Sequence, residues 1–324
     1  MKTVPLGKSA LQSSRLAYGG WRLASPSETV QVTPEREERG KAAVIAAFEA
    51  GFTLFDLADI YSDGASERIF GSALEAVAGM RDKVLVATKC GIRKAGQPEP
   101  NAPHRYDFSK EHILRSCDES LERMGIDTID LYQLHTPDPV TPIEETIGAL
   151  TELVTEGTIR AFGHSNFTAE QVIEAEEAAV RLGGARFESA QNEFSLLVRD
   201  AERELLPSVR RYGLGFLPFF PLYNGLFTGK FTRTERPSDT RIMRQRPHLA
   251  DTAPWDTIER YEVFCAEHGV TMLSATIGWL LAQPGLTSVI AGATGPEQLR
   301  QNAAASREWT PTADEVATIS GIFA

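Results

Sequence analysis

Four side chains of complementary chemistry stand at, or just beyond, the ends of apolar runs in the first half of the chain: Asp56, Tyr61, Lys89 and His135. A tyrosine hydroxyl titrates near pH ~10 when nothing perturbs it. A lysine ammonium beside it lowers that pKa, and a carboxylate supplies the counter-charge that a buried lysine needs. A neutral histidine can orient a carbonyl oxygen. The set predicts a general acid for carbonyl reduction.

Each of these residues alone has an ordinary structural explanation. Strand ends and turns are often polar, and a single lysine or histidine at the rim of a sheet is usually structural. Four complementary types at successive strand ends are harder to explain in that way. Because no side chain donates a hydride, the same hypothesis requires a cofactor that does.

The elements that must position these groups alternate between strands and helices. Eight strand-like runs lie at 15–20, 52–55, 84–88, 129–134, 159–163, 187–190, 214–220 and 288–292. Helical patterns lie at 38–51, 109–125, 142–157, 168–183 and 200–213, several ending at glycine, with Thr168 and Asp200 as expected N-caps. Strands alternating with helices predict a parallel sheet, and eight such units predict an α/β fold of the closed (β/α)8 TIM barrel type.

The remaining segments fit one barrel domain over residues 1–324. Residues 1–13 are expected to form an N-terminal hairpin that closes the bottom of the barrel, and 221–255 form a long loop after strand seven. Long loops within compact domains are usually functional. The competing doubly wound fold is disfavoured, because no GxGxxG follows the first strand.

Composition excludes several classes of protein. The formal net charge of -11 argues against a nucleic-acid surface. The three cysteines, with no CxxC, predict neither a disulfide framework nor a zinc site and favour a reducing compartment. No signal peptide and no membrane span is recognisable, so a cytoplasmic protein with no membrane partner is expected.

Seven motifs in order resemble the aldo-keto reductase superfamily: "GFTLFDLADIYSDGASE", "VLVATKCG", "DLYQLHTPDP", "GTIRAFGHSNF", "QNEFSLL", "PLYNGLFTGKF" and "VIAGATGPEQLRQN". The resemblance implies NADPH-dependent reduction of aldehydes or ketones, or the reverse reaction, with the hydride from nicotinamide C4. It implies that Tyr61 is the proton donor, that Lys89 and Asp56 support it, and that His135 orients the substrate.

The resemblance also implies a cofactor site. Ser165, Asn166 and Gln191 are expected to hold the nicotinamide carboxamide, and Phe219 to stack on its ring. Gly20 and Trp21 match the segment after strand one, where Trp21 walls the substrate pocket and Arg22 reaches the cofactor. The diphosphate and adenosine positions are matched by Leu222, Gly225, Lys230, Gly292, Ala293, Thr294, Gln298 and Asn302.

Some positions depart from the family pattern. Thr294 stands where many NADPH-preferring relatives carry a basic residue, and Gln301 where many carry a glutamate, so NADPH is favoured with NADH open. Arg300 or the arginines of the long loop are expected to compensate. Thr136 and Phe220 also differ from common family residues, and Thr136 should widen the substrate mouth.

Other conspicuous residues invite structural explanations. Asp59 is expected to be a solvated loop acid, and Glu67 a first-turn helix residue. His164 replaces a small apolar family residue and is expected to pack. Arg241, Arg244 and Arg246 are either a solvated run or a clasp over the cofactor's phosphates.

Three functional hypotheses follow. The leading one is a nicotinamide-dependent reductase of a small-molecule carbonyl compound. The alternative is a nucleotide-binding sensor or regulatory subunit with weak catalysis, disfavoured because all four catalytic types are present. An unrelated barrel isomerase or lyase would bind no nicotinamide nucleotide.

Overall fold

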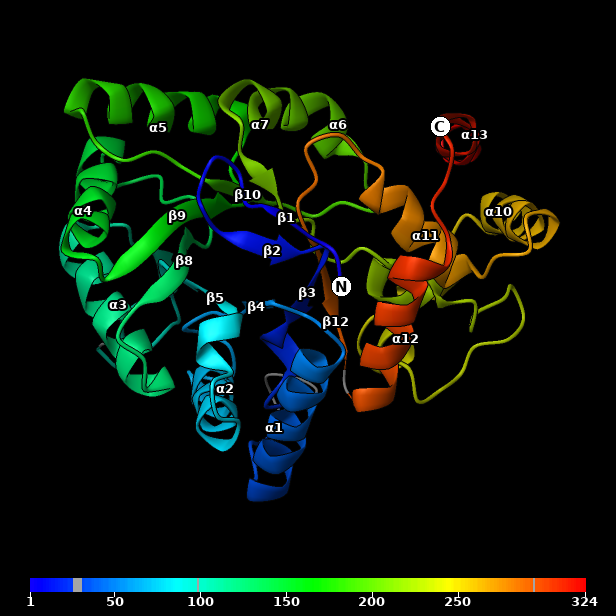
Figure 1. Cartoon of the computed structure of the whole chain (residues 1–324), viewed down its shortest axis with the longest axis horizontal. Coiled ribbons are helices and arrows are strands. Elements are labelled where there is room, and N and C mark those ends of the chain that lie inside the picture. Colours follow the sequence, from blue (N-terminus) through cyan, green and yellow to red (C-terminus); the bar gives the residue numbers. More distant parts are fainter. Residues whose placement is uncertain (26–30, 98, 294) are drawn as a thin grey trace.

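The computed structural model describes residues 1–25, 31–97, 99–293 and 295–324 (Figure 1). Eight parallel strands form one curved sheet in the order β11-β10-β9-β8-β5-β4-β3-β12. Their bounds are β3 (Leu16–Gly19), β4 (Leu54–Asp56), β5 (Leu85–Cys90), β8 (Ile129–Leu134), β9 (Ile159–Ser165), β10 (Ser189–Gln191), β11 (Gly215–Phe216) and β12 (Val289–Gly292). The predicted eight-stranded sheet is confirmed, although β11 is shorter than the apolar run 214–220.

Backbone hydrogen bonds close the ring between the two outer strands of this sheet. Thr287 N donates to Phe216 O at 2.9 Å, and Ile290 N donates to Pro218 O at 2.9 Å. With β12 also paired in parallel to β3, every strand has a neighbour on each side. The fold is therefore a (β/α)8 barrel, as the sequence predicts.

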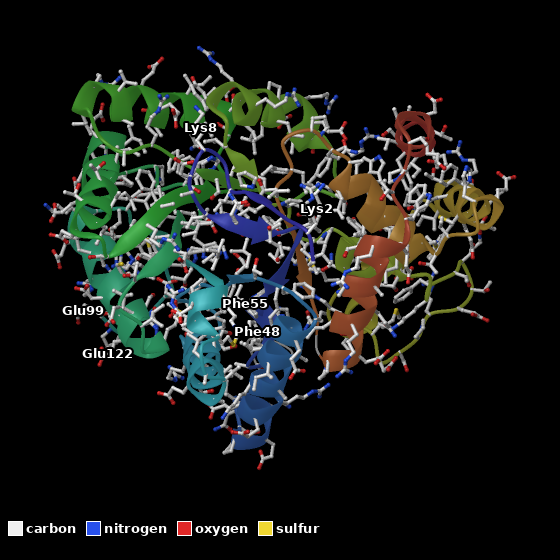
Figure 2. The ribbon with its side chains drawn as sticks, in the orientation of Figure 1. Lys2, Lys8, Phe48, Phe55, Glu99 and Glu122 are labelled. Carbon is white, nitrogen blue, oxygen red and sulfur yellow. The ribbon has the colours of Figure 1, made fainter. Side chains whose placement is uncertain are left out.

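Helices surround the barrel, as Figure 1 shows. They are α1 (Pro34–Glu49), α2 (Ala65–Ala76), α3 (Lys110–Met124), α4 (Ile143–Glu156), α5 (Ala169–Leu182), α6 (Asp200–Glu204), α7 (Leu206–Tyr212), α8 (Arg241–Gln245), α9 (His248–Asp251), α10 (Trp255–Glu267), α11 (Met272–Leu281), α12 (Pro296–Glu308) and α13 (Ala313–Ile322), with 3-10 turns η1 (Gly20–Arg22), η2 (Arg81–Lys83) and η3 (Tyr223–Thr228). Apolar side chains between sheet and helices form the main core, of which Figure 2 labels Phe55 on β4 and Phe48 on α1.

Local sequence accounts for several helix ends. Thr168 caps α5 through a capping box with Gln171, as predicted, and α3 and α5 end at left-handed Gly125 and Gly183. The expectation for Asp200 is wrong. Arg199 is the N-cap of α6 and Asp200 is its first residue.

The predicted helix 200–213 is divided in two at Leu205. Pro207 stands in the first turn of α7, where its missing N–H is tolerated, and it cannot continue a preceding helix.

The N-terminal hairpin of β1 (Thr3–Pro5) and β2 (Gln12–Ser14) lies across the ring of strands in Figure 1. Its Leu6 and Leu11 are buried in a second apolar cluster with the inward-facing side chains Ala17, Leu54, Leu85, Ala87, Leu131, Ala161, Leu217 and Ile290. The hairpin therefore fills the amino end of the barrel, as predicted, and leaves the carboxyl ends of the strands for chemistry.

The segment between β11 and α10 is long but structured, because it contains η3, α8 and α9. A two-stranded ribbon, β6 (Ile92–Arg93) with β7 (Arg105–Tyr106), follows β5. Among the residues that the structure describes, no helix is both long enough and apolar enough to cross a membrane.

We predict that Leu6→Ala lowers the free energy of unfolding by about 3 kcal/mol, because it leaves a cavity at the floor of the barrel. Urea unfolding of both proteins measures this. Leu182→Ala is the matched control, since Leu182 is 49% exposed and Leu6 is fully buried. Equal effects of the two substitutions would show that the hairpin does not seal the barrel.

Candidate active site

The Lys89 ammonium is the centre of the site. The residue is fully buried on β5, and its Nζ lies 2.7 Å from Asp56 Oδ1, 2.7 Å from Leu57 O and 3.3 Å from Tyr61 Oη. An ammonium has three protons to donate, and three acceptors surround it. The structure therefore brings Asp56, Lys89 and Tyr61 together, as predicted from their spacing.

The register of the parallel strands explains why Asp56 and Lys89 lie close together. In β4 and β5, Asp56 pairs with Ala87, and the next inward position along β5 is Lys89. Lys89 in turn pairs with Gln133 on β8. Gly20 allows close packing beside the acid, because a Cβ there would lie 2.6 Å from Leu57 Cδ2 and 3.2 Å from Asp56 O. Gly20 thus has a packing reason for being glycine.

The expectation that Lys89 lowers the pKa of Tyr61 below its ordinary value is wrong. Burial raises the pKa of Tyr61; Lys89 opposes that rise and Asp56 adds to it. The net pKa is higher than in free tyrosine, not lower, because desolvation outweighs the ammonium. Burial acts to lower the pKa of Lys89, but Asp56 and Tyr61 together raise it above its ordinary value. The site therefore holds a protonated phenol beside a charged lysine.

His135 faces Tyr61 from the end of β8. The ring centroids are 5.8 Å apart in an edge-on arrangement. Its backbone N–H donates to Cys90 O at 2.9 Å, and its carbonyl accepts from Asn166 Nδ2 at 3.0 Å. Burial, with a smaller contribution from Lys89, puts its pKa well below the ordinary value, so the imidazole is neutral at pH 7. A neutral ring suits an orienting role.

A chain of amide side chains continues the site across β8, β9 and β10, in which Gln133 and Gln191 are buried and Asn166 is exposed. Gln191 Nε2 donates to Asp56 Oδ1 at 2.9 Å and to Gln133 Oε1 at 3.0 Å. Asn166 adopts a left-handed φ of 63°, donates its backbone N–H to Gln191 O at 3.0 Å, and its Nδ2 to Ser165 Oγ at 3.1 Å. Both donors of Gln191 are used, which leaves its Oε1 as an acceptor.

Gln133 is a site residue that sequence reasoning missed. It is fully buried on β8, and its Nε2 donates to Ser189 Oγ at 3.2 Å. The available signal was a lone amide inside the apolar run "IDLYQL", since a buried amide needs partners.

Aromatic rings and arginines lie over the site. Trp21 is 6.5 Å from the Tyr61 ring and 5.7 Å from the Phe220 ring. Arg22 stacks over Trp21 at 3.9 Å, and Arg241 lies 4.8 Å from the same ring. The arginine run of the long loop is thus divided, because Arg241 folds over the site while Arg244 is exposed.

The segment after β11 is conformationally strained. Phe220, Tyr223 and Asn224 adopt positive φ values of 52°, 45° and 60°, and Gly225 adopts 106°. Non-glycine residues in this region cost roughly 1–3 kcal/mol each, and they cluster where a ligand is bound. Phe219 packs edge-on against Phe220 at 5.1 Å.

The other expected cofactor positions are spread over two segments. Leu222 and Gly225 lie in or beside η3, while Lys230 is exposed just beyond it. Gly292 ends β12, Gln298 and Asn302 lie on α12, and Asn302 is buried. Thr294 lies outside the described residues.

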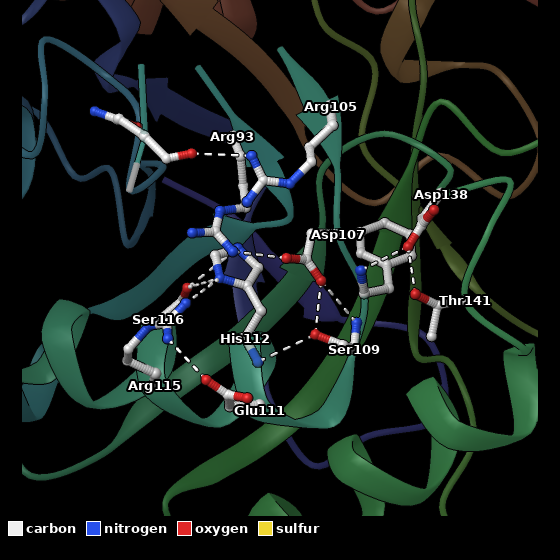
Figure 3. A network of polar contacts seen from close by, with 12 residues as sticks. Arg93, Arg105, Asp107, Ser109, Glu111, His112, Arg115, Ser116, Asp138 and Thr141 are labelled. Atoms are coloured by element: carbon white, nitrogen blue, oxygen red, sulfur yellow. Dashed lines mark hydrogen bonds and ion pairs between the residues drawn. The ribbon is translucent and has the colours of Figure 1, made fainter. Parts of the chain in front are cut away.

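A polar network joins the loops after β5 and β8 at the same end of the barrel (Figure 3). Asp107 accepts from Arg93 Nη1 at 2.8 Å, and Asp138 Oδ2 accepts from Phe108 N at 2.8 Å and from Thr141 Oγ1 at 2.5 Å. These bonds brace the rim around His135.

Two acids behind Tyr61 behave differently from each other. Glu67 lies in the first turn of α2, as predicted, and is fully buried with Arg123 Nε at 2.6 Å. Asp59 is not the solvated acid expected. Its Oδ1 is buried and has no partner among the residues described, and its pKa is raised to about 8 by burial and by Glu67.

His164 packs in the core, as expected, but its burial takes two polar ring nitrogens out of water. It is fully buried between Phe167 and Phe187, with ring centroids 4.8 and 4.9 Å away. Neither ring nitrogen has a hydrogen-bond partner within the described part of the chain. Burial lowers its pKa to about 3.

We predict that His164→Leu raises the free energy of unfolding by about 1–3 kcal/mol at pH 7, since it removes unpaired buried nitrogens. The unfolded state gains a proton below about pH 6.5 and the folded state does not, so the wild type loses up to about 1.4 kcal/mol per pH unit as the pH falls. The difference in the free energy of unfolding between His164→Leu and the wild type should therefore be about 2 kcal/mol larger at pH 5 than at pH 7. Urea titrations at both pH values measure it, with exposed His104→Leu as control; a constant difference would contradict the prediction.

A parallel barrel that gathers tyrosine, lysine, aspartate and histidine at its carboxyl end has the fold and the site of a nicotinamide-dependent carbonyl oxidoreductase. The sequence model described as "Aldo/keto reductase family" matches residues 15–323. The chain belongs to the aldo/keto reductase family.

Three similar proteins place it within that family. An NADH-specific methylglyoxal reductase of Escherichia coli (strain K12) is 34% identical over 317 residues, covering 94% of this chain and 93% of the relative. A probable voltage-gated potassium channel subunit beta of Oryza sativa subsp. japonica is 32% identical and covers 92% and 88%. The solved glycerol dehydrogenase of Gluconobacter oxydans has a TM-score of 0.83 at 28% identity and covers 99% and 94%.

Proposed function

We propose that this protein reduces an aldehyde or ketone to the alcohol with a nicotinamide nucleotide, with Tyr61 as the proton donor. One observation carries the proposal: Lys89 Nζ bridges Asp56 Oδ1 at 2.7 Å and Tyr61 Oη at 3.3 Å, with the His135 ring 5.8 Å from the Tyr61 ring. The Asp56, Tyr61, Lys89 and His135 assignment rests on this geometry and on the motif match.

The residues present fit a nicotinamide nucleotide. Gln191 Oε1 is left as an acceptor, which suits an amide N–H. Among the described residues, chain neighbours apart, no atom lies within 4 Å of where a Cβ of Gly225 would be, and near that of Gly292 the one such atom is Gly19 O, at 4.0 Å. Ligand atoms can therefore approach both backbones past these residues. Ser165, Asn166, Phe219 and the strained segment after β11 complete the proposed cradle. When bound, the reduced nicotinamide supplies the hydride that the side chains lack.

The catalytic side chains then have distinct tasks. The Tyr61 hydroxyl gives its proton to the carbonyl oxygen, and Lys89 Nζ stabilises the phenolate that remains. Asp56 keeps Lys89 charged. Neutral His135 fixes the position of the carbonyl oxygen by a hydrogen bond. The reverse reaction, oxidation of an alcohol, uses the same groups.

The next question is whether the protein uses NADPH or NADH. The sequence favours NADPH and leaves NADH open, and the Escherichia coli relative is named as NADH-specific. Arg300 was expected to bind the 2′-phosphate of NADPH in place of the missing basic residue. Its Nη1 lies 3.8 Å from Oε2 of Glu297 on the same helix. We propose that the chain accepts NADH. The expected cytoplasmic location stays a prediction, with which three free cysteines agree.

We predict that Tyr61→Phe lowers kcat for carbonyl reduction by roughly 10²–10⁴, the range for a lost general acid, while NADH binds with nearly unchanged affinity. Absorbance decay with 4-nitrobenzaldehyde measures turnover, and fluorescence titration measures binding. Retention of more than a tenth of the activity would remove Tyr61 from the role of proton donor.

We predict that neither Tyr61 nor His135 changes its protonation state between about pH 6.5 and 9, so that any change in the rate of reduction within this range comes from Asp59, whose pKa is about 8. Raising the pKa of Tyr61 keeps it protonated above about pH 10, and lowering that of His135 keeps the ring neutral above about pH 6.5. Loss of the Tyr61 proton should therefore slow reduction only above about pH 10. A rate that declines between pH 7 and 9 in the Asp59→Asn variant as well as in the wild type would assign the acid to another group.

A second candidate function has a specific basis. The rice relative is named a probable channel subunit beta, which matches the sensor hypothesis. Nucleotide binding without turnover on a broad carbonyl panel would favour this reading. The four proposed catalytic side chains favour the enzyme, because Lys89 contacts Asp56 and Tyr61 while the His135 ring lies 5.8 Å from the Tyr61 ring.

A further inference from the structure

Gln133 is a buried amide for which the proposed chemistry has no task. It lies inside the barrel on β8, fully shielded from solvent, and is paired in register with Lys89 on β5. The Lys89 ammonium already has three acceptors on other residues, so Gln133 does not serve that charge. Burying an amide costs free energy unless its polar atoms are hydrogen-bonded, so its partners indicate what it does.

Both ends of the Gln133 side chain are hydrogen-bonded. Its Oε1 accepts from Gln191 Nε2 at 3.0 Å, and its Nε2 donates to Ser189 Oγ at 3.2 Å. Ser189 is also fully buried, and it stands opposite Gly163 in the parallel pair of β9 and β10. A Cβ at residue 163 would lie 2.0 Å from Ser189 Oγ, so only glycine leaves room for this hydroxyl. The fold thus reserves space for a partner of Gln133.

The direction of each bond in this chain is set at one end by Asp56. A carboxylate only accepts hydrogen bonds, so Gln191 must turn its Nε2 towards Asp56 Oδ1, which lies 2.9 Å away. The second N–H of the same nitrogen goes to Gln133 Oε1, which leaves Gln133 Nε2 to face Ser189. Turning either amide over would bring two oxygens or two N–H groups together. Each amide is therefore held in one of its two orientations.

Two acceptors hold the Gln191 amide, and together they decide which of its atoms is left over. Asp56 alone would fix one N–H and leave the amide free to rotate about that bond. With Gln133 as the second acceptor, both N–H groups are used, and Oε1 is the atom without a hydrogen-bond partner among the described residues. Such an oxygen accepts hydrogen bonds and cannot donate them. It therefore distinguishes a ligand group that carries an N–H from one that does not.

We propose that Gln133 is a positioning residue that fixes the Gln191 amide, so that the site selects a nucleotide whose nicotinamide ring substituent carries an N–H donor. This inference rests on the proposed function, because it assigns Gln133 to the recognition of the carboxamide group. In this role Gln133 acts through Gln191 and not by its own contact with the nucleotide.

The test compares two nucleotides that differ at this ring substituent. They are NADH and its reduced 3-acetylpyridine analogue, in which a methyl group replaces the NH2 of the carboxamide. The Kd of each nucleotide is measured by quenching of tryptophan fluorescence for the wild type and for Gln133→Met. Methionine keeps the length of the side chain but removes the acceptor for Gln191 Nε2.

Leu131→Ala is the matched control. Leu131 is fully buried on the same strand, two residues before Gln133, and it packs in the apolar cluster at the floor of the barrel. Its truncation destabilises the barrel without touching the amide chain. Ser189→Ala serves if Gln133→Met fails to fold by circular dichroism, because it removes the acceptor of Gln133 Nε2 and frees that amide to turn away from Gln191.

We expect the wild type to bind NADH about tenfold more tightly than the acetylpyridine analogue, as for one lost hydrogen bond. In Gln133→Met this ratio of Kd values should fall to about threefold or less, because the Gln191 amide can then turn. Ser189→Ala should lower the ratio in the same direction. Leu131→Ala should keep the wild-type ratio, even if both Kd values rise.

Other outcomes overturn the inference in different ways. A wild-type ratio in Gln133→Met would show that Asp56 alone fixes Gln191. An equal fall in Gln133→Met and Leu131→Ala would assign the effect to lost packing. Equal binding of both nucleotides by a wild type that still reduces 4-nitrobenzaldehyde would overturn this inference and leave the proposed function standing. A wild type that binds neither NADH nor NADPH would remove the proposed function, and this inference with it.

Discussion

The arrangement of the site depends on the buried, charged ammonium of Lys89, which needs acceptors around it. An isolated charge in the interior costs several kcal/mol, so it persists only with acceptors on every side. Asp56, Leu57 O and Tyr61 Oη fill that requirement, and each comes from the loop or strand next to β5. The same contacts that make the lysine tolerable also hold the phenol in place. Stability and chemistry at this point therefore cannot be separated.

The barrel makes this coincidence possible. Lys89 and Gln133 are paired in register, and Asp56 stands opposite Ala87, one inward position before Lys89. Gln191 joins this polar layer by donating to both Asp56 and Gln133. Below this polar layer lies the apolar floor around Leu6 and Leu11. Water is thus kept from the underside of the site, and the polar groups face only the open end of the barrel.

Sequence alone located the strands well and picked out the four side chains that the fold gathers at Lys89 and Tyr61, because periodic apolar runs and strand-end polar residues are local signals. The catalytic roles of these side chains stay a prediction. It failed where distant groups compete. The raised pKa of Tyr61 depends on burial by several elements, which local spacing does not report. The role of Gln133 depends on Ser189 and Gln191, more than fifty positions away. Asp59 looked solvated because its neighbours Glu67 and Arg123 approach it only in the fold.

The pairing of β3, the first barrel strand, with β12, the last, has a kinetic consequence. Leu16 pairs with Val289, so the first barrel strand finds one of its partners only after nearly the whole chain exists. Contacts of such long sequence separation slow folding, since the entropy of closing the loop is lost before the strands gain their bonds. During synthesis β3 must wait with one edge unpaired, and unpaired edges invite intermolecular pairing. The time for which this edge stays open during folding therefore matters for the yield of closed barrels, in addition to the stability of the finished fold.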